Sequence, residues 1–387
     1  MTGAVVGALD ALDRDVMDPG VRTLLDRKAE KIAAANAYTP LATADVEQTL
    51  RRFFSDEAPG KTVSGVQRMG GGASKEQFLF SLDGTSHVLR MDPIETAAET
   101  DRRREYEVLN AYSGSVPAPC ALWLDEDGSR FGQPAVVMDF MSGVTKPTAE
   151  VTGPNVTGLG TSFSAKLREQ LAPQYLRALA SLHNVDWRAL ELPSFHAPRP
   201  GTTEAALWQV NWMSRVWRDD HVQASPIIAL TDRWLRRNLP VCESPVMVHG
   251  DYRTGNFLFD EQAGQITAIL DWEWAHLGDY HEDLGWMMQR LYTTHQDGRD
   301  LVCGLFEKQE LIEAYEAASG RKVDPATLKW YEIYNAYKSM AITLATSVKA
   351  ARDGANHQDA MLSWLAPCGY LFSTWLCTML ADEGVTL

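Results

Sequence analysis

The stretch that decides the fold is HGDYRTGN at residues 249–256, followed by ILDWEWAHLGDYHEDLGW at residues 269–286. Short apolar runs stand on both sides of the first segment and open the second, which is typical of short buried strands that carry polar loops. Asp251 and Asn256 share one loop, and a hairpin through the turn EQAGQ predicts that Asp271 returns beside Asn256. The set offers one carboxylate as a base, and an amide and a second carboxylate for a hard cation such as Mg²⁺.

The charge of this region favours a cation site. Residues 249–285 include eight Asp or Glu residues and one basic residue, Arg253, so the stretch carries a net charge of −7. A solvated acidic surface is the alternative interpretation, and it suits the acidic turn at 260–261. It suits Asp251 and Asp271 less well, because both adjoin apolar strands.

Together these segments resemble the catalytic segment of the aminoglycoside phosphotransferase and choline kinase group, within the protein-kinase-like fold. They are nearest to the branch of kinase-like domains fused to some acyl-CoA dehydrogenases. The group's pattern is HxDxxxxN, then a metal-binding Asp at a strand end, then GDxxxDL, which is found here at residues 278–284. The resemblance covers about residues 60–380.

The resemblance implies a role for each matched residue. Asp251 corresponds to the base that accepts the substrate hydroxyl proton, and Asn256 and Asp271 correspond to Mg²⁺ ligands. His249 is expected to brace the loop, and Arg253, in the same loop, completes the candidate catalytic set. Asp283 is expected to be a structural acid beneath the loop.

The N-terminal half predicts a small sheet. Alternating, turn-bounded runs indicate three strands, a charged helix and two more strands; the runs are VSGVQRM (63–69), EQFLFSL (76–82), SHVLRM (86–91), ETDRRREYEVLNAY (99–112), CALWLDE (120–126) and PAVVMDF (134–140). This order of elements is α+β, and the resemblance described above implies that the fold is a bilobal protein-kinase-like fold. It would have a helical extension at 1–60, a nucleotide-binding lobe at 61–145 and a helical lobe at 146–387 that carries the catalytic loop and the acceptor site.

Candidate nucleotide-binding residues lie mostly in this sheet. The glycine-rich segment GGGASKEQF at residues 70–78 would bring backbone N–H groups close to phosphates, although an ordinary glycine-rich hairpin is an equal alternative. Where the family has a Lys on the third strand, this chain has an Arg, which can hold phosphate oxygens but is not a simple replacement. This residue is Arg90, and its predicted partner on the following helix is Glu105, which shares a helix face with the apolar residues. Lys75 is a fallback phosphate ligand. The predicted cofactor-binding residues are Gly71, Gly72, Ser74, Arg90, Glu105, Asp139 and Met141. The last two belong to VVMDFMSG, which resembles the lobe-connecting hinge of the family, where main-chain atoms would meet adenine.

Composition narrows the class of protein. The 387 residues include 36 Lys or Arg and 51 Asp or Glu, for a net charge of −15, which argues against nucleic-acid binding and against docking on an anionic membrane. Five cysteines without a CxxC pair make a reducing cytoplasm the simplest setting, and the N-terminus is a poor signal peptide. The uncharged stretch 360–381 is predicted to form two buried helices separated at Pro367 rather than a membrane anchor.

The predicted function is an ATP- or GTP-dependent kinase that phosphorylates a hydroxyl of a small molecule, with Mg²⁺ as cofactor. Aminoglycoside-, choline- and hydroxyacyl-type acceptors all remain open, as does a homodimer. A nucleotide-binding pseudokinase is the main alternative, and a metal-dependent hydrolase is another. A zinc site at His276, Asp279, His281 and Asp283 is a weaker hypothesis. The candidates for an acceptor pocket are Trp272, Trp274, Trp286, Trp330, Tyr331, Tyr334 and Tyr337, although any one of them is more often a core residue.

Overall fold

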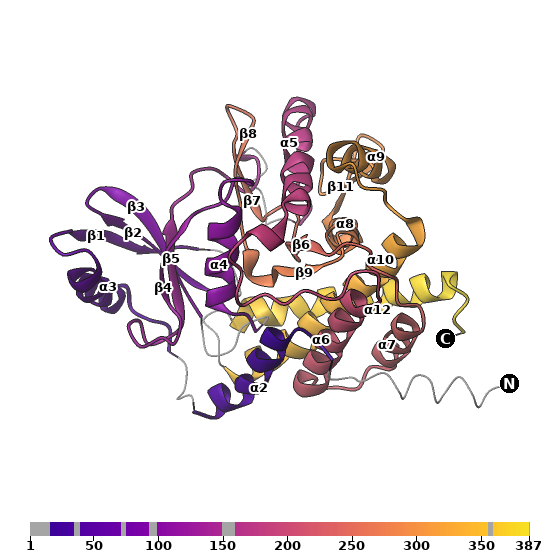
Figure 1. Cartoon of the computed structure of the whole chain (residues 1–387), viewed down its shortest axis with the longest axis horizontal. Helices are drawn as coiled ribbons and strands as arrows, with labels where there is room; N and C mark the ends of the chain where they lie inside the picture. The colour runs from indigo at the N-terminus through magenta and orange to yellow at the C-terminus, as the bar shows by residue number, and fades with distance from the viewer. Residues whose placement is uncertain are drawn as a thin grey trace.

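The structure, a computed structural model, describes residues 16–34, 39–70, 75–92, 99–148, 159–354 and 359–386. Figure 1 shows two lobes side by side, a sheet-containing lobe and a larger, mainly helical lobe. The small lobe is built on an antiparallel five-stranded sheet in the order β1-β2-β3-β5-β4. Its strands are β1 (Val63–Arg68), β2 (Glu76–Leu82), β3 (Thr85–Met91), β4 (Ala121–Asp125) and β5 (Ala135–Asp139). The predicted α+β bilobal fold is therefore confirmed.

One face of the sheet is covered by α3 (Thr43–Glu57). Strand β2 alternates between buried and half-buried side chains, and its buried set packs against Phe53 and Phe54 of α3. A tight turn joins β2 to β3 at Asp83 and Gly84, which both have positive φ angles, of 50° and 85°. This is the geometry that an Asp-Gly hairpin requires.

The opposite side of the sheet meets α4 (Arg102–Tyr112), which lies between the sheet and the helical lobe (Figure 1). Asp101 caps this helix by accepting a hydrogen bond from the Arg103 amide at 2.8 Å. Val108, Leu109 and Tyr112 form its apolar stripe and join the largest core of the protein. The stripe orients the polar side chains of α4 toward the junction between the lobes.

The large lobe is a set of helices around three short antiparallel strand pairs. The pairs are β6 (Val246–Val248) with β9 (His276–Gly278), β7 (Phe257–Asp260) with β8 (Gln265–Ile269), and β10 (Thr293–Gln296) with β11 (Arg299–Val302). The helices are α5 (Ala165–Asn184), α6 (Glu204–Asp220), α7 (Pro226–Arg237), α8 (His281–Met287), α9 (Lys308–Ser319), α10 (Pro325–Ala341), α11 (Ser347–Asp353) and α12 (Asp359–Asp382). A single π-helical turn, Ile342–Thr346, links α10 to α11.

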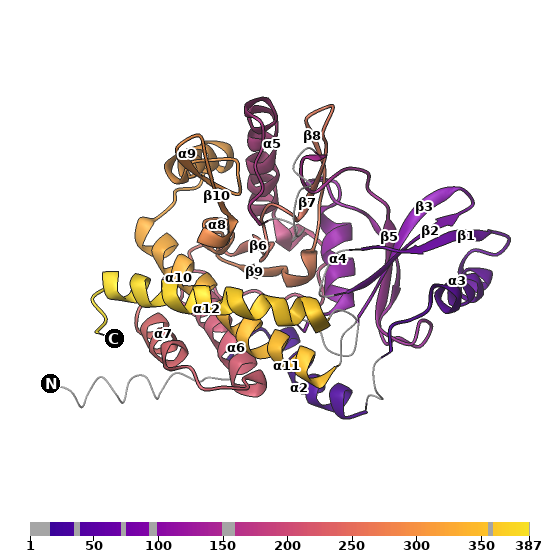
Figure 2. The same cartoon turned by 180° about the vertical axis from the view of Figure 1, so that it is seen from behind.

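The N-terminal helices belong to different cores. Val21 and Leu25 of helix α2 (Pro19–Ala34) belong to the hydrophobic core of the helical lobe, whereas α3 packs on the sheet. Figure 2 shows α2 beneath α11, away from α3. The described part of segment 1–60 is helical as predicted, but its two helices are not one unit; the domain boundaries themselves stay predictions.

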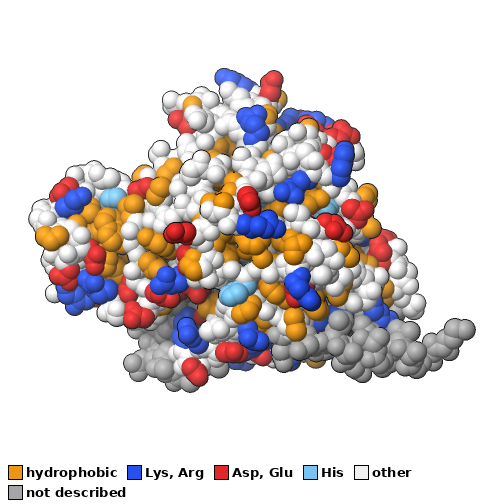
Figure 3. Space-filling view, in the orientation of Figure 1, with side chains coloured by type: hydrophobic (Ala, Val, Ile, Leu, Met, Phe, Trp, Pro, Cys, Tyr) orange, Lys and Arg blue, Asp and Glu red, His pale blue; other side chains and the backbone are white. Residues whose placement is uncertain are grey.

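The C-terminal segment differs from the prediction of two buried helices. Helix α12 is continuous through Pro367, and three large apolar side chains on it are exposed: Trp364, Tyr370 and Leu371. Its other face packs on α10 and α11, and this contact outweighs the single hydrogen bond that a proline removes. Among the described helices, none is long and apolar enough to cross a membrane. On the face in Figure 3, acidic and basic side chains are interspersed.

Candidate active site

A cleft of about 510 Å³ runs between the lobes and continues into the helical lobe. We divide it into two parts. The sheet-side arm is lined by Met69, Gly70, Gln77, Val88, Pro119, Met138, Asp139, Phe140, Met141, Leu258 and Leu270. The helix-side arm is lined by Trp286, Leu291, Tyr292, Ser339, Ile342, Thr343, Leu365, Cys368 and Phe372. Asp251, Asn256, Asp271, Glu273 and Arg90 line the same cleft.

The Asp251 carboxylate is held by three hydrogen bonds. Asn256 Nδ2 donates to Oδ2 at 2.6 Å, while Trp286 Nε1 and Arg253 Nε donate to Oδ1 at 2.7 and 3.0 Å. Arg253 stays positively charged. Burial alone would lower its pKa, but the Asp251 carboxylate raises that pKa above its usual value. Because Asn256 lies beside Asp271 and Trp286 belongs to the helix-side arm, Asp251 sits where the two parts of the cleft meet.

The backbone of the loop is fixed from below. Asp283, fully buried, accepts hydrogen bonds from the amides of His249 and Gly250 at 2.8 and 2.9 Å, and its Oδ2 lies 3.1 Å from Nε2 of buried His183. Burial alone would raise the pKa of Asp283, but its hydrogen bond to His183 and the histidines around it lower it, so it stays ionised. The expected structural position of Asp283 is thus the one observed.

His249 braces the loop in its neutral form. Its Nε2 lies 3.0 Å from the Leu270 carbonyl, and its Nδ1 accepts a hydrogen bond from the Asp251 amide at 3.2 Å. Burial lowers the pKa of His249, which favours the neutral ring with its proton on Nε2. The ring therefore ties the loop to the strand end that leads to Asp271.

The hairpin brings Asp271 back beside Asn256, as predicted. The Leu270 amide donates to the Asn256 carbonyl at 2.7 Å where β7 and β8 pair. Asp271 has a left-handed backbone, φ 62° and ψ 56°, which is uncommon for a residue other than Gly and typical of functional sites. This conformation ends the strand and presents the carboxylate to the cleft.

Arg90 connects the two lobes. Its Nη1 lies 2.5 Å from Glu105 Oε1 and its Nη2 lies 2.9 Å from Asp271 Oδ1. The predicted pairing with Glu105 rather than Glu107 is present, since Glu107 instead binds the amide and hydroxyl of Ser194. A single guanidinium thus joins the sheet, helix α4 and the strand end at Asp271.

Further buried charges surround Arg90. Lys75 Nζ lies 2.9 Å from Asp92 Oδ1 and donates to Thr100, so this side chain is engaged within the small lobe rather than free to bind phosphate as a fallback ligand. Burial would raise the pKa of Asp92, but Arg102 and Lys75 lower it to about 2. Glu273 was not predicted as a site residue; it lies 3.5 to 3.8 Å from nitrogens of Arg90, Arg102 and Lys75.

The other predicted residues divide into three groups. Asp139 and Met141 line the sheet-side arm, at the connection between the lobes where they were expected. Gly71, Gly72 and Ser74 lie outside the described residues. Among the aromatic candidates, Trp274 and Trp286 line the cleft, whereas Trp272, Trp330, Tyr331, Tyr334 and Tyr337 are buried in the cores.

The zinc hypothesis is wrong for the described residues, which contain no group of three or more His, Cys, Asp or Glu side chains placed to hold a metal. The four candidates instead pair separately. His276 contacts Glu282, His281 contacts Asp279, and Asp283 contacts His183.

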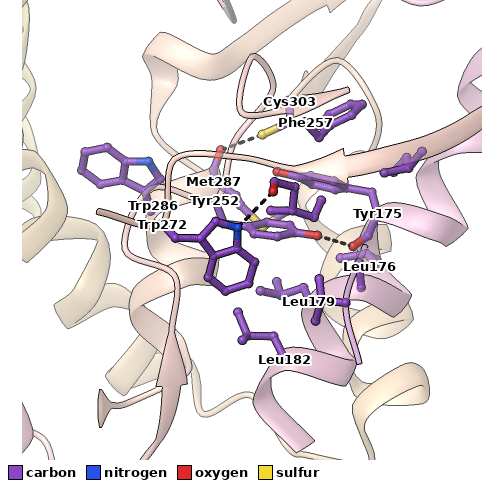
Figure 4. Close-up of a cluster of buried hydrophobic side chains, with 14 of the residues drawn as sticks. Tyr175, Leu176, Leu179, Leu182, Tyr252, Phe257, Trp272, Trp286, Met287 and Cys303 are labelled. Carbon is purple, nitrogen blue, oxygen red and sulfur yellow. Dashed lines mark hydrogen bonds between the residues drawn. The ribbon is translucent and has the colours of Figure 1, made fainter. Parts of the chain in front are cut away.

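An apolar and aromatic core packs beneath the loop that carries Asp251. Figure 4 shows Tyr252 and Trp272 between the leucines of α5 and the side chains of Trp286 and Met287. The Tyr252 hydroxyl donates to the Tyr175 carbonyl at 2.7 Å, and Trp272 Nε1 donates to the Ile269 carbonyl at 3.0 Å. These bonds satisfy the polar ends of large buried rings and fix the residues that flank Asp251 and Asp271.

We expect the protein to lose stability as the pH falls below about 6.5. Burial lowers the pKa of His183 and of His249 from 6.5, so the unfolded chain takes up protons that the folded chain does not. The two neutral histidines contribute fully to the free energy of unfolding above about pH 6.5. This contribution is lost as the pH falls from there toward their lower pKa values in the folded state. Urea unfolding midpoints measured from about pH 8 to about pH 5 check this. The exposed-site variant His295→Gln should keep the same pH dependence, and a midpoint that does not change with pH would contradict the prediction.

The two lobes, the cleft between them and the loop anchored at its floor define the class of this protein, a kinase-like phosphotransferase fold. The sequence profile of the Phosphotransferase enzyme family matches residues 65–331. The chain belongs to this family.

Curated relatives carry the names of the predicted branch. The chain is 28% identical over 229 residues to acyl-CoA dehydrogenase family member 10 of Mus musculus, covering 57% of this chain and 20% of that protein. It is 26% identical over 324 residues to the probable acyl-CoA dehydrogenase IBR3 of Arabidopsis thaliana, covering 76% of this chain and 38% of that protein. The chain thus spans less than two fifths of the length of these relatives.

Solved structures share the fold. A Ralstonia eutropha protein provisionally described as an aminoglycoside phosphotransferase superposes with a TM-score of 0.63 at 22% identity, over 86% of this chain and 98% of that chain. Aminoglycoside phosphotransferase APH(4)-Ia, in a ternary complex with AMP-PNP and hygromycin B, gives 0.56 at 17% identity, over 86% and 98%. APH(2")-IIIa, in complex with GDP and kanamycin, gives 0.54 at 15% identity, over 86% and 98%.

Proposed function

We propose that this chain is an ATP- or GTP-dependent phosphotransferase that moves the γ-phosphate to a hydroxyl of a small molecule, with Asp251 as the base. The observation that carries the proposal is the Asp251 carboxylate, held by Asn256 and Trp286 where the two arms of the cleft meet. Asp251 takes the proton of the acceptor hydroxyl while the acceptor oxygen bonds to the γ-phosphorus. The bond from that phosphorus to the bridging oxygen breaks, and the nucleoside diphosphate leaves.

The residues beside Asp251 fit a magnesium ion. Asn256 uses its Nδ2 toward Asp251, which leaves its amide oxygen as the ligand atom, and the Asp271 carboxylate is 39% exposed and lines the cleft. Mg²⁺ prefers such oxygen ligands together with phosphate oxygens, and when bound it would neutralise charge on the phosphates. Asn256 and Asp271 are its proposed ligands.

The nucleotide is proposed to occupy the sheet-side arm. Apolar side chains line that arm on both lobes, and Asp139 and Met141, whose main-chain atoms are the proposed adenine contacts, line it as well. Arg90, held by Glu105 and directed at Asp271, is placed to contact phosphate oxygens. AMP-PNP and GDP in the two related complexes support a nucleotide without deciding between ATP and GTP.

The lining of the helix-side arm bears on the type of acceptor. Among the described residues, its lining is aromatic and aliphatic, with the hydroxyls of Ser339 and Thr343, and the carboxylate of Asp251 lies at its junction with the sheet-side arm. A polycationic acceptor such as an aminoglycoside is better matched by carboxylates, because burying unpaired cations is costly. The lining therefore supports a hydroxyacyl-type acceptor over an aminoglycoside. Choline stays open, because aromatic rings such as those of Trp286, Tyr292 and Phe372 can hold a quaternary ammonium.

A screen of alcohols tests the proposal. Purified protein with Mg²⁺ and either ATP or GTP is mixed with hydroxyacyl compounds, aminoglycosides, choline and macrolides, and formation of the nucleoside diphosphate is measured. Acceptor-dependent turnover with a hydroxyacyl compound is the expected result. Nucleotide binding without turnover on any acceptor would favour the pseudokinase, and phosphate release from a phosphoester without nucleotide would favour a hydrolase. Cytoplasmic location and a homodimer stay predictions from the sequence.

Replacing Arg90 tests the nucleotide side of the site. We expect Arg90→Ala to lower kcat/KM for the nucleotide by roughly 10- to 100-fold, since a hydrogen bond from a charged group is worth about 1.5–3 kcal/mol. Arg90→Lys should retain more activity because it keeps the charge but loses the fork that spans Glu105 and Asp271. Steady-state kinetics with varied nucleotide measures the effect. Arg103→Ala, an exposed residue on the same part of the chain, is the control, and unchanged kinetics in Arg90→Ala would contradict the assignment.

A further inference from the structure

Lys338 is a buried lysine beneath the catalytic loop. It belongs to α10 and is 1% exposed, and its Nζ donates to the Gly250 carbonyl at 2.9 Å. The same ammonium lies 4.7 Å from the ring centroid of Trp274 and 4.8 Å from that of Trp286. A cation desolvated between two indoles interacts strongly with both rings. Lys338 therefore holds one backbone atom and two rings that border the cleft.

The peptide that precedes Asp251 is held on both sides. The Gly250 amide donates to Asp283 at 2.9 Å, and the Gly250 carbonyl accepts from Lys338. Gly250 has a φ of 79°, and a Cβ there would lie 2.7 Å from the Trp274 carbonyl oxygen, so the loop passes close over Trp274. The hydrogen bonds from Gly250 to Asp283 and from Lys338 to Gly250 thus fix the backbone that leads into Asp251.

The side chain of Asp251 is linked to Lys338 through Trp286. Trp286 Nε1 donates to Asp251 Oδ1 at 2.7 Å, and the ring that carries this donor is the one the ammonium contacts. A shift of that ring would move the donor away from the carboxylate. Lys338 therefore influences both the backbone and the carboxylate of the proposed base without touching the carboxylate.

An ion pair keeps Lys338 in this position. Its Nζ lies 3.3 Å from Oε1 of Glu282, which is fully buried, and Oε2 of Glu282 lies 3.2 Å from Nε2 of buried His276. A buried ammonium stays charged only where a carboxylate pairs with it. Glu282 is that partner for Lys338.

We propose that Lys338 is a positioning residue for phosphoryl transfer: through the Gly250 carbonyl and the Trp286 ring it fixes the Asp251 carboxylate at the acceptor hydroxyl. The proposal rests on the proposed function for its kinetic consequence. Its structural part, control of Trp286 by Lys338, stands on the contacts alone.

The kinetic test uses Lys338→Met. We expect kcat to fall roughly 100-fold, as misplacement of a catalytic group by about 1 Å does, while the dissociation constant of the nucleotide changes by less than about twofold. Lys338→Met leaves the buried carboxylate of Glu282 unpaired, which can destabilise the fold. If the single variant folds poorly, the double variant Glu282→Gln/Lys338→Met, which removes both charges, is measured instead. Lys308→Met removes an exposed lysine and should leave kcat unchanged. A double variant that folds normally and keeps the parent kcat would overturn the proposal.

A second measurement does not depend on turnover. With ¹⁵N-labelled tryptophan, the indole N–H signal of Trp286, assigned by its loss in Trp286→Phe, should shift in Lys338→Met, while that of Trp187, whose indole donates to the Pro245 carbonyl, should not. If the Trp286 signal of Lys338→Met does not shift, the proposal is overturned, whatever the value of kcat. If the signal shifts but kcat equals that of the parent protein, the proposal is also overturned. If the parent protein shows no turnover, the proposed function fails, and the Trp286 signal alone decides whether Lys338 controls its neighbour.

Discussion

Asp251→Asn is expected to lower kcat by roughly 10²–10⁴-fold, the range for loss of a positioned general base. The amide oxygen of an asparagine can still accept the hydrogen bonds from Trp286 and Arg253, which both go to Oδ1. Its NH₂ group would face the Nδ2 donor of Asn256, so that one hydrogen bond is lost, at a part-buried position. The asparagine cannot take the proton of the acceptor hydroxyl. The effect should therefore appear in kcat, with the dissociation constant of the nucleotide changed by less than about threefold, because binding does not require the base.

Two measurements check this result. Turnover is followed under saturating nucleotide and acceptor, and nucleotide binding is measured separately by calorimetry. Asp186→Asn, a replacement of an exposed carboxylate in the same lobe, is the matched control and should behave like the parent. Parental turnover in Asp251→Asn would mean that another group removes the proton, and the catalytic assignment would fail.

Asp283→Asn is expected to destabilise the protein by about 2–5 kcal/mol, the largest effect on folding that we predict. The carboxylate accepts hydrogen bonds from two backbone amides and faces His183, all in the interior. An asparagine would direct an NH₂ group at one of these donors. Because the lowered pKa of Asp283 keeps it ionised, its contribution is fully present above the unfolded pKa and is lost only as the pH falls through the folded one.

Urea unfolding of Asp283→Asn at neutral pH measures this loss. Asp260→Asn is the control, since Asp260 is exposed and accepts hydrogen bonds only within its own turn. It should change stability by less than about 0.5 kcal/mol. An Asp283→Asn variant as stable as the parent would show that the loop does not depend on this anchor.

The sequence predicted the elements whose patterns are local. Strand β2 alternates strictly, and the Asp83-Gly84 turn requires positive φ angles, so the hairpin could be read from the residues. The hairpin β7–β8 likewise placed Asp271 beside Asn256. The choice of Glu105 over Glu107 followed from the apolar face of one helix.

Long-range pairings could not be predicted in the same way. Helical spacing puts Lys338 on the same face as Tyr331, Tyr334 and Ala341, but it does not reveal the partner, a carbonyl 88 residues earlier in the chain. Lys75 appeared to belong to the glycine-rich segment, but Asp92 and Thr100 hold it in the interior. Pro367 predicted a break that packing against α10 and α11 overrides.

Because α2 belongs to the helical lobe and α3 to the sheet, the polypeptide crosses from one half of the molecule to the other at two places, once between these helices and once after β5. Ion pairs strengthen the first crossing, since Arg104 of α4 binds Asp18 at 3.0 Å and Glu99 binds Lys31 at 3.0 Å. Two covalent links restrain shear and twist more than one does. A relative rotation of the lobes about the axis through both links would therefore disturb these connections least.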